Sequence, residues 1–153
     1  MYDVTVNDEI ELSYPDDFKV LTPEEITHYF TSANNRWTAK DNERHLLLSV
    51  AWTKPGFISY ITDSRSVMKG IESQLKRNMN AFCKIGSETI VLGSHKGHAL
   101  SYEYRARDKD ISQCGELIVF RQKDKFYIID YIYRKENSAE AKDVLNTILP
   151  TIK

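Results

Sequence analysis

The centre of the fold can be derived from residues 114–134, which read CGELIVFRQKDKFYIIDYIYR. Two mostly apolar runs flank the short turn Lys123-Asp124, an arrangement that is typical of a β-hairpin. The predicted cross-strand pairs are Gln122–Lys125, Leu117–Asp130, Glu116–Tyr131 and Val119–Ile128. The hairpin therefore predicts not only two strands but also which residues share a face of the sheet.

Both faces of this predicted hairpin are mostly apolar. One face carries Cys114, Glu116, Ile118, Phe120, Tyr127, Ile129, Tyr131 and Tyr133. The other carries Gly115, Leu117, Val119, Arg121, Phe126, Ile128, Asp130 and Ile132. An antiparallel sheet with one wet face would alternate apolar and polar residues instead. We therefore expect an α+β fold, with an antiparallel β-sheet covered by helices on both faces in a three-layer α/β/α sandwich.

The segments on either side of the hairpin supply further strands and two amphipathic helices. Strands are predicted at Thr89–Leu92 and Ala99–Arg107, and a closing helix at about Ser138–Leu149. A long helix is predicted from Ser64 to about Asn80 or Phe82. Its apolar stripe consists of Val67, Met68, Ile71, Leu75, Met79 and Phe82. Gly70 inside this helix indicates close packing, because glycine is otherwise unfavourable there.

The amino-terminal third is predicted to contain a short helix between extended segments. Strands are expected at Ile10–Tyr14 and Phe18–Leu21, and a hairpin at Arg36–Ala39 and Arg44–Thr53. Thr22-Pro23-Glu24-Glu25 has the residues of a capping box with proline at the first helical position, and the helix should end near Ser32.

Length and composition favour one globular domain over residues 1–153, although the sequence leaves open that the chain is part of a longer protein. The 21 basic and 22 acidic residues leave a net charge of -1, which offers no field for nucleic acid or an anionic membrane. No long apolar run or signal peptide is visible, so a cytoplasmic location is expected, with a trimmed signal sequence as the alternative. Cys83 and Cys114 are expected to be reduced.

The order of these elements resembles a known family. The relevant features are the Tyr14–Phe18 turn, the capped helix, the hairpin, the long helix, a meander containing Gly97-His98-Ala99 and the closing helix. Together they resemble the Mog1/PsbP-like superfamily, which includes a binder of the Ran GTPase and an extrinsic subunit of photosystem II. The resemblance implies an antiparallel sheet between helices and a role in binding. It carries over no catalytic residue.

No motif for a cofactor or a metal is present. The six glycines are scattered, without a phosphate-binding loop or a nucleophile elbow, so we expect no cofactor. His95 and His98 are three residues apart in an extended segment and should project to opposite faces, as solvated loop histidines rather than metal ligands.

Three acidic residues inside predicted strands offer the one enzymatic alternative. Glu103, Glu116 and Asp130 could form a carboxylate-based site together with a tyrosine or a histidine. Such a site requires at least two of these groups to converge in a pocket. On the predicted register Glu116 and Asp130 face opposite sides of the sheet, which favours structural roles.

The same strands also carry most of the tyrosines and several arginines. The predicted binding surface consists of Asp130, Tyr131, Tyr133, Tyr102, Tyr104, Arg105, Arg107 and Arg134. Tyrosines beside arginine can stack on single-stranded nucleic acid, but the mixed charge at this sheet end argues against it. We therefore expect a non-catalytic module that binds an unknown protein or small ligand. The sequence does not indicate an oligomeric state.

Overall fold

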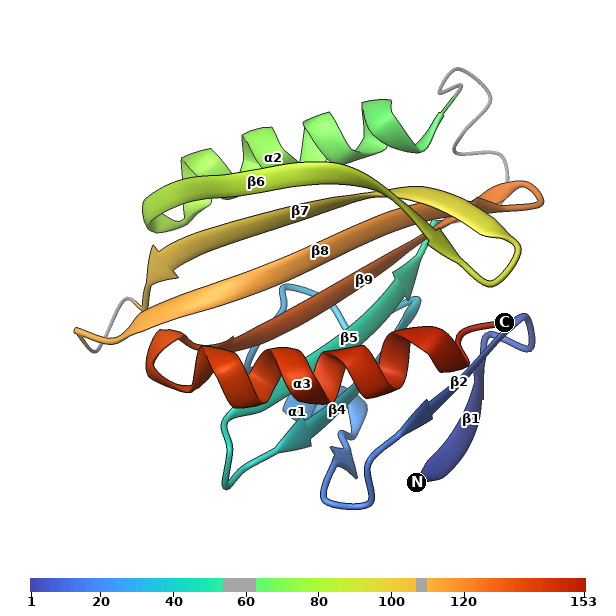
Figure 1. Ribbon diagram of the computed structural model, residues 1–153, viewed down its shortest axis with the longest axis horizontal. Coiled ribbons are helices and arrows are strands. Elements are labelled where there is room, and N and C mark those ends of the chain that lie inside the picture. The colour runs from blue at the N-terminus through green and yellow to red at the C-terminus, as the bar shows by residue number, and fades with distance from the viewer. Residues whose placement is uncertain (54–62, 107–109) are drawn as a thin grey trace.

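The computed structural model contains a large antiparallel sheet and a small one (Figure 1). It describes residues 1–53, 63–106 and 110–153. In these ranges the strands are β1 Tyr2–Val6, β2 Ile10–Tyr14, β3 Lys19–Val20, β4 Arg36–Asp41, β5 Leu46–Trp52, β6 Asn80–Leu92, β7 His95–Arg105, β8 Ser112–Gln122 and β9 Lys125–Arg134. The helices are α1 Pro23–Ile26, α2 Ser64–Asn78 and α3 Ser138–Ile148, and 3-10 turns span Lys135–Asn137 and Leu149–Thr151.

The large sheet has the strand order β3-β4-β5-β9-β8-β7-β6, and every neighbouring pair is antiparallel. The predicted α+β class with an antiparallel sheet is confirmed. The register predicted for the β8–β9 hairpin is also confirmed, from Gln122 opposite Lys125 to Leu117 opposite Asp130. β1 was not predicted; it pairs with β2 in a separate two-stranded sheet.

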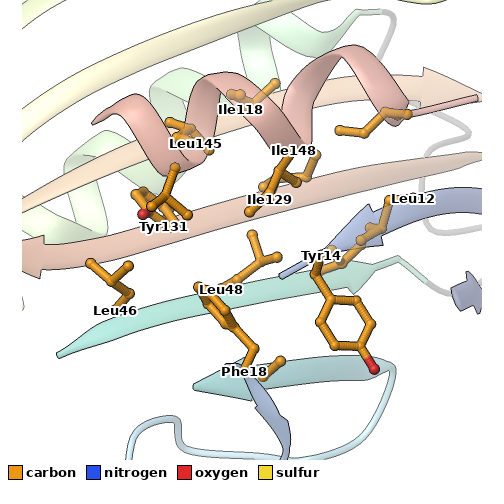
Figure 2. Packing of buried hydrophobic residues seen from close by; sticks show 14 of the residues in the cluster. Leu12, Tyr14, Phe18, Leu46, Leu48, Ile118, Ile129, Tyr131, Leu145 and Ile148 are labelled. Carbon is orange, nitrogen blue, oxygen red and sulfur yellow. The ribbon is translucent and has the colours of Figure 1, made fainter. Parts of the chain in front are cut away.

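Two hydrophobic clusters lie on the two faces of the β8–β9 hairpin. The larger contains Ile118, Ile129 and Tyr131 of the sheet together with Leu145 and Ile148 of α3 (Figure 2). The smaller contains Leu117, Val119 and Phe126 together with Met68 of α2. Since the side chains of neighbouring strand residues point to opposite faces, both clusters are built from the same two strands. This explains why the hairpin sequence is apolar on both sides.

The first helix begins where the sequence predicts but is shorter. Thr22 Oγ1 accepts a hydrogen bond from the Glu25 backbone N–H at 3.2 Å, and the Glu25 carboxylate accepts one from the Thr22 N–H at 3.0 Å. These two bonds form the predicted capping box. The helix ends at Ile26 instead of near Ser32, and turns lead on to β4.

The second helix ends earlier than predicted, and the next strand begins earlier. α2 ends at Asn78, and β6 runs over 13 residues instead of starting at Thr89. The apolar stripe predicted too long a helix because Met79 and Phe82, which lie beyond its end, also pack against the smaller cluster. The expected close packing at Gly70 is wrong, since no atom outside its own helix backbone and chain neighbours lies within 4 Å of the place a Cβ would occupy.

No helix in the described ranges is long and apolar enough to cross a membrane.

Candidate functional site

The most unusual interaction in the sheet joins Tyr102 to Asp130 across an intervening strand. The Tyr102 hydroxyl on β7 donates to Asp130 Oδ1 on β9 at 3.0 Å, and β8 lies between them. The ring can take this path because Gly115 of β8, the register partner of Tyr102, has no side chain. A Cβ at Gly115 would lie 2.1 Å from Cζ of Tyr102. The glycine therefore makes room for the hydrogen bond.

On its other side Asp130 is next to a polar row from β5 and β4. Ser49 is its register partner, and Thr38 is the partner of Ser49 in turn. Arg36 Nη1 donates to Ser49 Oγ at 2.6 Å, and its guanidinium lies 3.9 Å from the centre of the Phe30 ring. We call Asp130, Tyr102, Ser49, Thr38 and Arg36 the Asp130 cluster. It is a polar group of residues next to the smaller hydrophobic cluster.

The electrostatics of this cluster are dominated by desolvation. Burial raises the pKa of Asp130 to about 6, against the lowering effects of the Tyr102 hydrogen bond and the charge of Arg36. Burial lowers the pKa of Arg36, while the charge of Asp130 raises it. Arg36 Nε is buried and has no hydrogen-bond partner among the described residues. The cluster therefore carries an incompletely compensated charge pair.

Beside the Asp130 cluster, on the same face of the sheet, lies a hollow of about 450 Å³. We call it the Tyr104 hollow. Its lining residues are His28, Tyr29, Lys40, His45, Leu47, Tyr104, Gln113, Ile132 and Arg134. Its floor consists of two rows of register partners, Tyr104–Gln113–Arg134 and Ile132–Leu47–Lys40. The segment after α1 and the β4–β5 turn supply the walls, so residues distant in sequence converge here.

The lining of the Tyr104 hollow is cationic and aromatic. Lys40 Nζ donates to the Tyr29 hydroxyl at 2.6 Å, and the Tyr104 hydroxyl donates to Gln113 Oε1 at 3.1 Å. Arg134 has one carboxylate nearby, that of Glu136 at 3.8 Å. Among the described residues no carboxylate lines the hollow, and Lys40 forms no ion pair. Lys40 and Arg134 thus give this space positive character, and two histidines also line it.

The structure divides the predicted binding surface between two faces. Tyr102, Tyr104, Asp130 and Arg134 share the face of the hollow. Tyr131 and Tyr133 lie on the opposite face, where both are buried in the larger cluster. The Tyr131 hydroxyl donates to the carbonyl of Ala141 at 2.8 Å, so it has a structural partner.

Of the two remaining predicted residues, the structure describes one. Arg105 ends β7 in an exposed ion pair with Asp110 at 2.5 Å. Arg107 lies outside the described residues. Sequence reasoning missed the wall residues His28, Tyr29 and His45 and the floor residue Lys40. These residues reach the hollow only through the pairing of β4 with β5 and the path of the chain after α1.

The three acids of the enzymatic alternative do not converge. Asp130 lies on the hollow side, whereas Glu116 lies on the α3 side and accepts hydrogen bonds from Ser101 and Tyr133 at 2.5 and 2.9 Å. Glu103 accepts one from Lys135 at 3.2 Å. Five hollows formed by described residues can be compared, and none of these five is lined by two of these acids.

His95 and the two cysteines lie outside the Tyr104 hollow. The expectation that His95 is a solvated loop residue is wrong. His95 is buried at the start of β7, and its ring lies 4.7 Å from that of Phe120. Burial lowers its pKa. Cys83 is exposed and Cys114 buried, and both thiols are free. In the described part of the chain no three His, Cys, Asp or Glu residues could hold a metal ion.

Comparison with known proteins places the fold but not the activity. No family model and no curated protein matches the sequence. Among solved structures, cyanobacterial PsbP (CyanoP) from Synechocystis sp. PCC 6803 is similar with a TM-score of 0.69 at 13% identity, over 97% of this chain and 88% of that one.

Two further solved structures have the same architecture. LpqN, involved in cell envelope biogenesis of Mycobacterium tuberculosis, has a TM-score of 0.65 at 16% identity, over 99% of this chain and 88% of that one. The Saccharomyces cerevisiae Ran-binding protein Mog1p has a TM-score of 0.60 at 11% identity, over 94% and 82%. At such low identity the likeness establishes the fold alone.

Proposed function

We propose that this chain, which has the Mog1/PsbP-like fold, is a non-catalytic binding module whose site is the Tyr104 hollow. The observation that carries the proposal is the convergence of Lys40, Arg134, His28 and His45 without a lining carboxylate among the described residues. A volume of about 450 Å³ suits a small molecule. Similar solved structures include a Ran-binding protein, which supports binding in general but no particular partner.

The chemistry of the lining defines the ligand class. Arginine and lysine recognise carboxylate or phosphate groups, and arginine can do so with two parallel hydrogen bonds. Tyr104 and Tyr29 add aromatic surface on which a flat apolar group can rest. The ligand is therefore a small anion that carries a planar apolar group.

Calorimetric titration with phenyl phosphate and with benzoate tests this proposal. We expect saturable binding of at least one of them, which weakens with added salt. Replacing Lys40 or Arg134 by Gln should weaken it about tenfold each, because a charge-assisted hydrogen bond is lost. Lys76→Gln, an exposed site on α2, is the matched control.

Three outcomes would contradict the proposal. Benzamide, a neutral analogue of benzoate, could bind as tightly as the anions. The Lys40 and Arg134 variants could bind as the original chain does. A single-stranded oligonucleotide could bind far more tightly than phenyl phosphate and compete with it, which would replace the small anion by nucleic acid as the ligand.

The expected cytoplasmic location remains a proposal from the sequence, which cell fractionation tests.

A further inference from the structure

The two edges of the large sheet differ greatly in length. β3, at one edge, has two residues, whereas β6, at the other, has 13. Edge strands present unpaired N–H and C=O groups, and proteins blunt them by shortening, bulges or charges. The β3 edge is blunted by its length. No described strand pairs with the outer edge of β6, so this edge needs a separate explanation.

β6 is protected over its first half only. Its pairing with β7 is irregular between Asn80 and Gly86, and Ala81 there has a φ of 54°. Such irregularities disrupt the flat edge that another strand needs. From Gly86 to Leu92 the register with β7 is regular. In this half Val91 is 61% exposed, although valine favours a covered strand.

Two hollows flank the regular half of β6, one on each face of the sheet. The α3-side hollow, about 380 Å³, has apolar lining residues that include Ile90, Leu145 and Leu149, and it also has the charged residues Glu88, Glu116 and Lys142 in its lining. The α2-side hollow, about 400 Å³, is lined by Arg65, Lys69, Ser87 and Thr89 among others. Because side chains alternate along a strand, a segment laid beside β6 would direct its side chains to these two sides in turn.

The charges beside the edge define the side chains that fit. Arg65 and Lys69 are one turn apart on α2 and form no ion pair with any described residue. The neighbouring Glu72 is already paired with Lys84 at 3.1 Å. Glu88 lines both hollows and opposes an acidic side chain placed next to it. An acidic side chain therefore fits on the α2 side beside Arg65 and Lys69, and an apolar one fits on the α3 side against Ile90, Leu145 and Leu149.

We propose that the Gly86–Leu92 edge of β6 takes up an extended segment of a partner protein, added to the sheet as a further strand. The segment alternates apolar side chains, toward α3, with acidic ones, toward α2. Main-chain hydrogen bonds to β6 supply affinity, and the two hollows supply specificity. The proposal uses none of the residues that line the Tyr104 hollow and is independent of the function proposed there.

The test is selection of displayed random peptides of about nine residues, within the usual range of strand lengths, on the full chain. We expect winners that alternate apolar and acidic residues and that slow hydrogen exchange at the amides of residues 86–92 on binding. A selection that enriches no sequence, or winners that leave these amides unprotected, would overturn the proposal.

Two variations make the test specific for strand addition. Two versions of a winning peptide are compared, one N-methylated at its odd-numbered residues and one at its even-numbered residues. One version should lose binding and the other should keep it, because only alternate amides of an added strand face β6. Equal binding of the two versions contradicts the proposal. Lys69→Glu should weaken binding of acidic winners about tenfold, with Lys76→Glu on the same helix as control.

Sedimentation of the chain alone distinguishes a second copy from a partner. The proposal expects no concentration-dependent dimer. A dimer that protects the amides of residues 86–92 from hydrogen exchange would show that the added strand is β6 of a second copy. This result would overturn the proposal of a partner segment.

Discussion

Replacing Asp130 by Asn should remove the part of the pH dependence of stability that Asp130 contributes. Asp130 has a pKa of about 6 in the folded chain, against an ordinary value of 3.8. Between these values the folded state holds a proton at Asp130 that the unfolded state releases, so the Asp130 contribution to stability falls as the pH rises and levels off above about 6. A rise from 3.8 to about 6 corresponds to about 3 kcal/mol of unfolding free energy.

The effect is measured by urea unfolding of both proteins between about pH 4 and pH 7. Relative to wild type, the Asp130→Asn variant should gain about 2.5 kcal/mol over this range, whatever the intrinsic cost of the amide, because part of the full effect lies below pH 4. Asp143→Asn, at an exposed site on α3, gives the background of exchanging a carboxylate for an amide. A wild-type-to-variant difference that stays constant with pH would refute the account of Asp130 as a desolvated carboxylate.

Three other substitutions test neighbouring parts of the structure by denaturant unfolding. Gly115→Ala should cost about 1–3 kcal/mol, because the new Cβ displaces the Tyr102 ring, and an unchanged stability would contradict the path of that ring. Gly70→Ala should instead stabilise α2 by up to about 1 kcal/mol, since nothing lies near the added methyl group; destabilisation would indicate packing there. Glu9→Gln should cost about 1–2 kcal/mol at neutral pH, because the carboxylate accepts the Tyr127 hydroxyl at 2.7 Å. The hydrogen bonds from Tyr127 and from Lys125 Nζ, the latter at 2.9 Å, lower the pKa of Glu9. The loss of stability should therefore shrink as the pH falls below that pKa, and a loss independent of pH would contradict this role of the carboxylate.

The parts of the fold that were predictable are those in which sequence neighbours are also spatial neighbours. The β8–β9 register follows from a two-residue turn, and the α1 start follows from four consecutive residues. β6 could not be recognised in the same way. Most of its residues are exposed, so burial imposes no alternation on residues 80–88, while Met79 and Phe82 prolong the helical pattern.

The candidate site was only partly predictable for a related reason. The alternation along β7 and β9 correctly separates Asp130 from Tyr131, but tyrosine content alone grouped both faces into one surface. The walls of the Tyr104 hollow come from segments whose approach depends on tertiary structure, such as His28 after α1 and His45 in the β4–β5 turn. Residue type gave no reason to connect them.

Binding of a small anion in the Tyr104 hollow can be mapped by ¹H–¹⁵N NMR titrations with phenyl phosphate and with benzoate. With at least one of them we expect saturable shift changes for residues around His28, Lys40, Tyr104 and Arg134. In the Arg134→Gln variant, whose spectrum should stay that of the folded protein, the same changes should need about ten times more ligand. Saturable changes that map elsewhere, or none at these residues with either ligand, would contradict binding in this hollow.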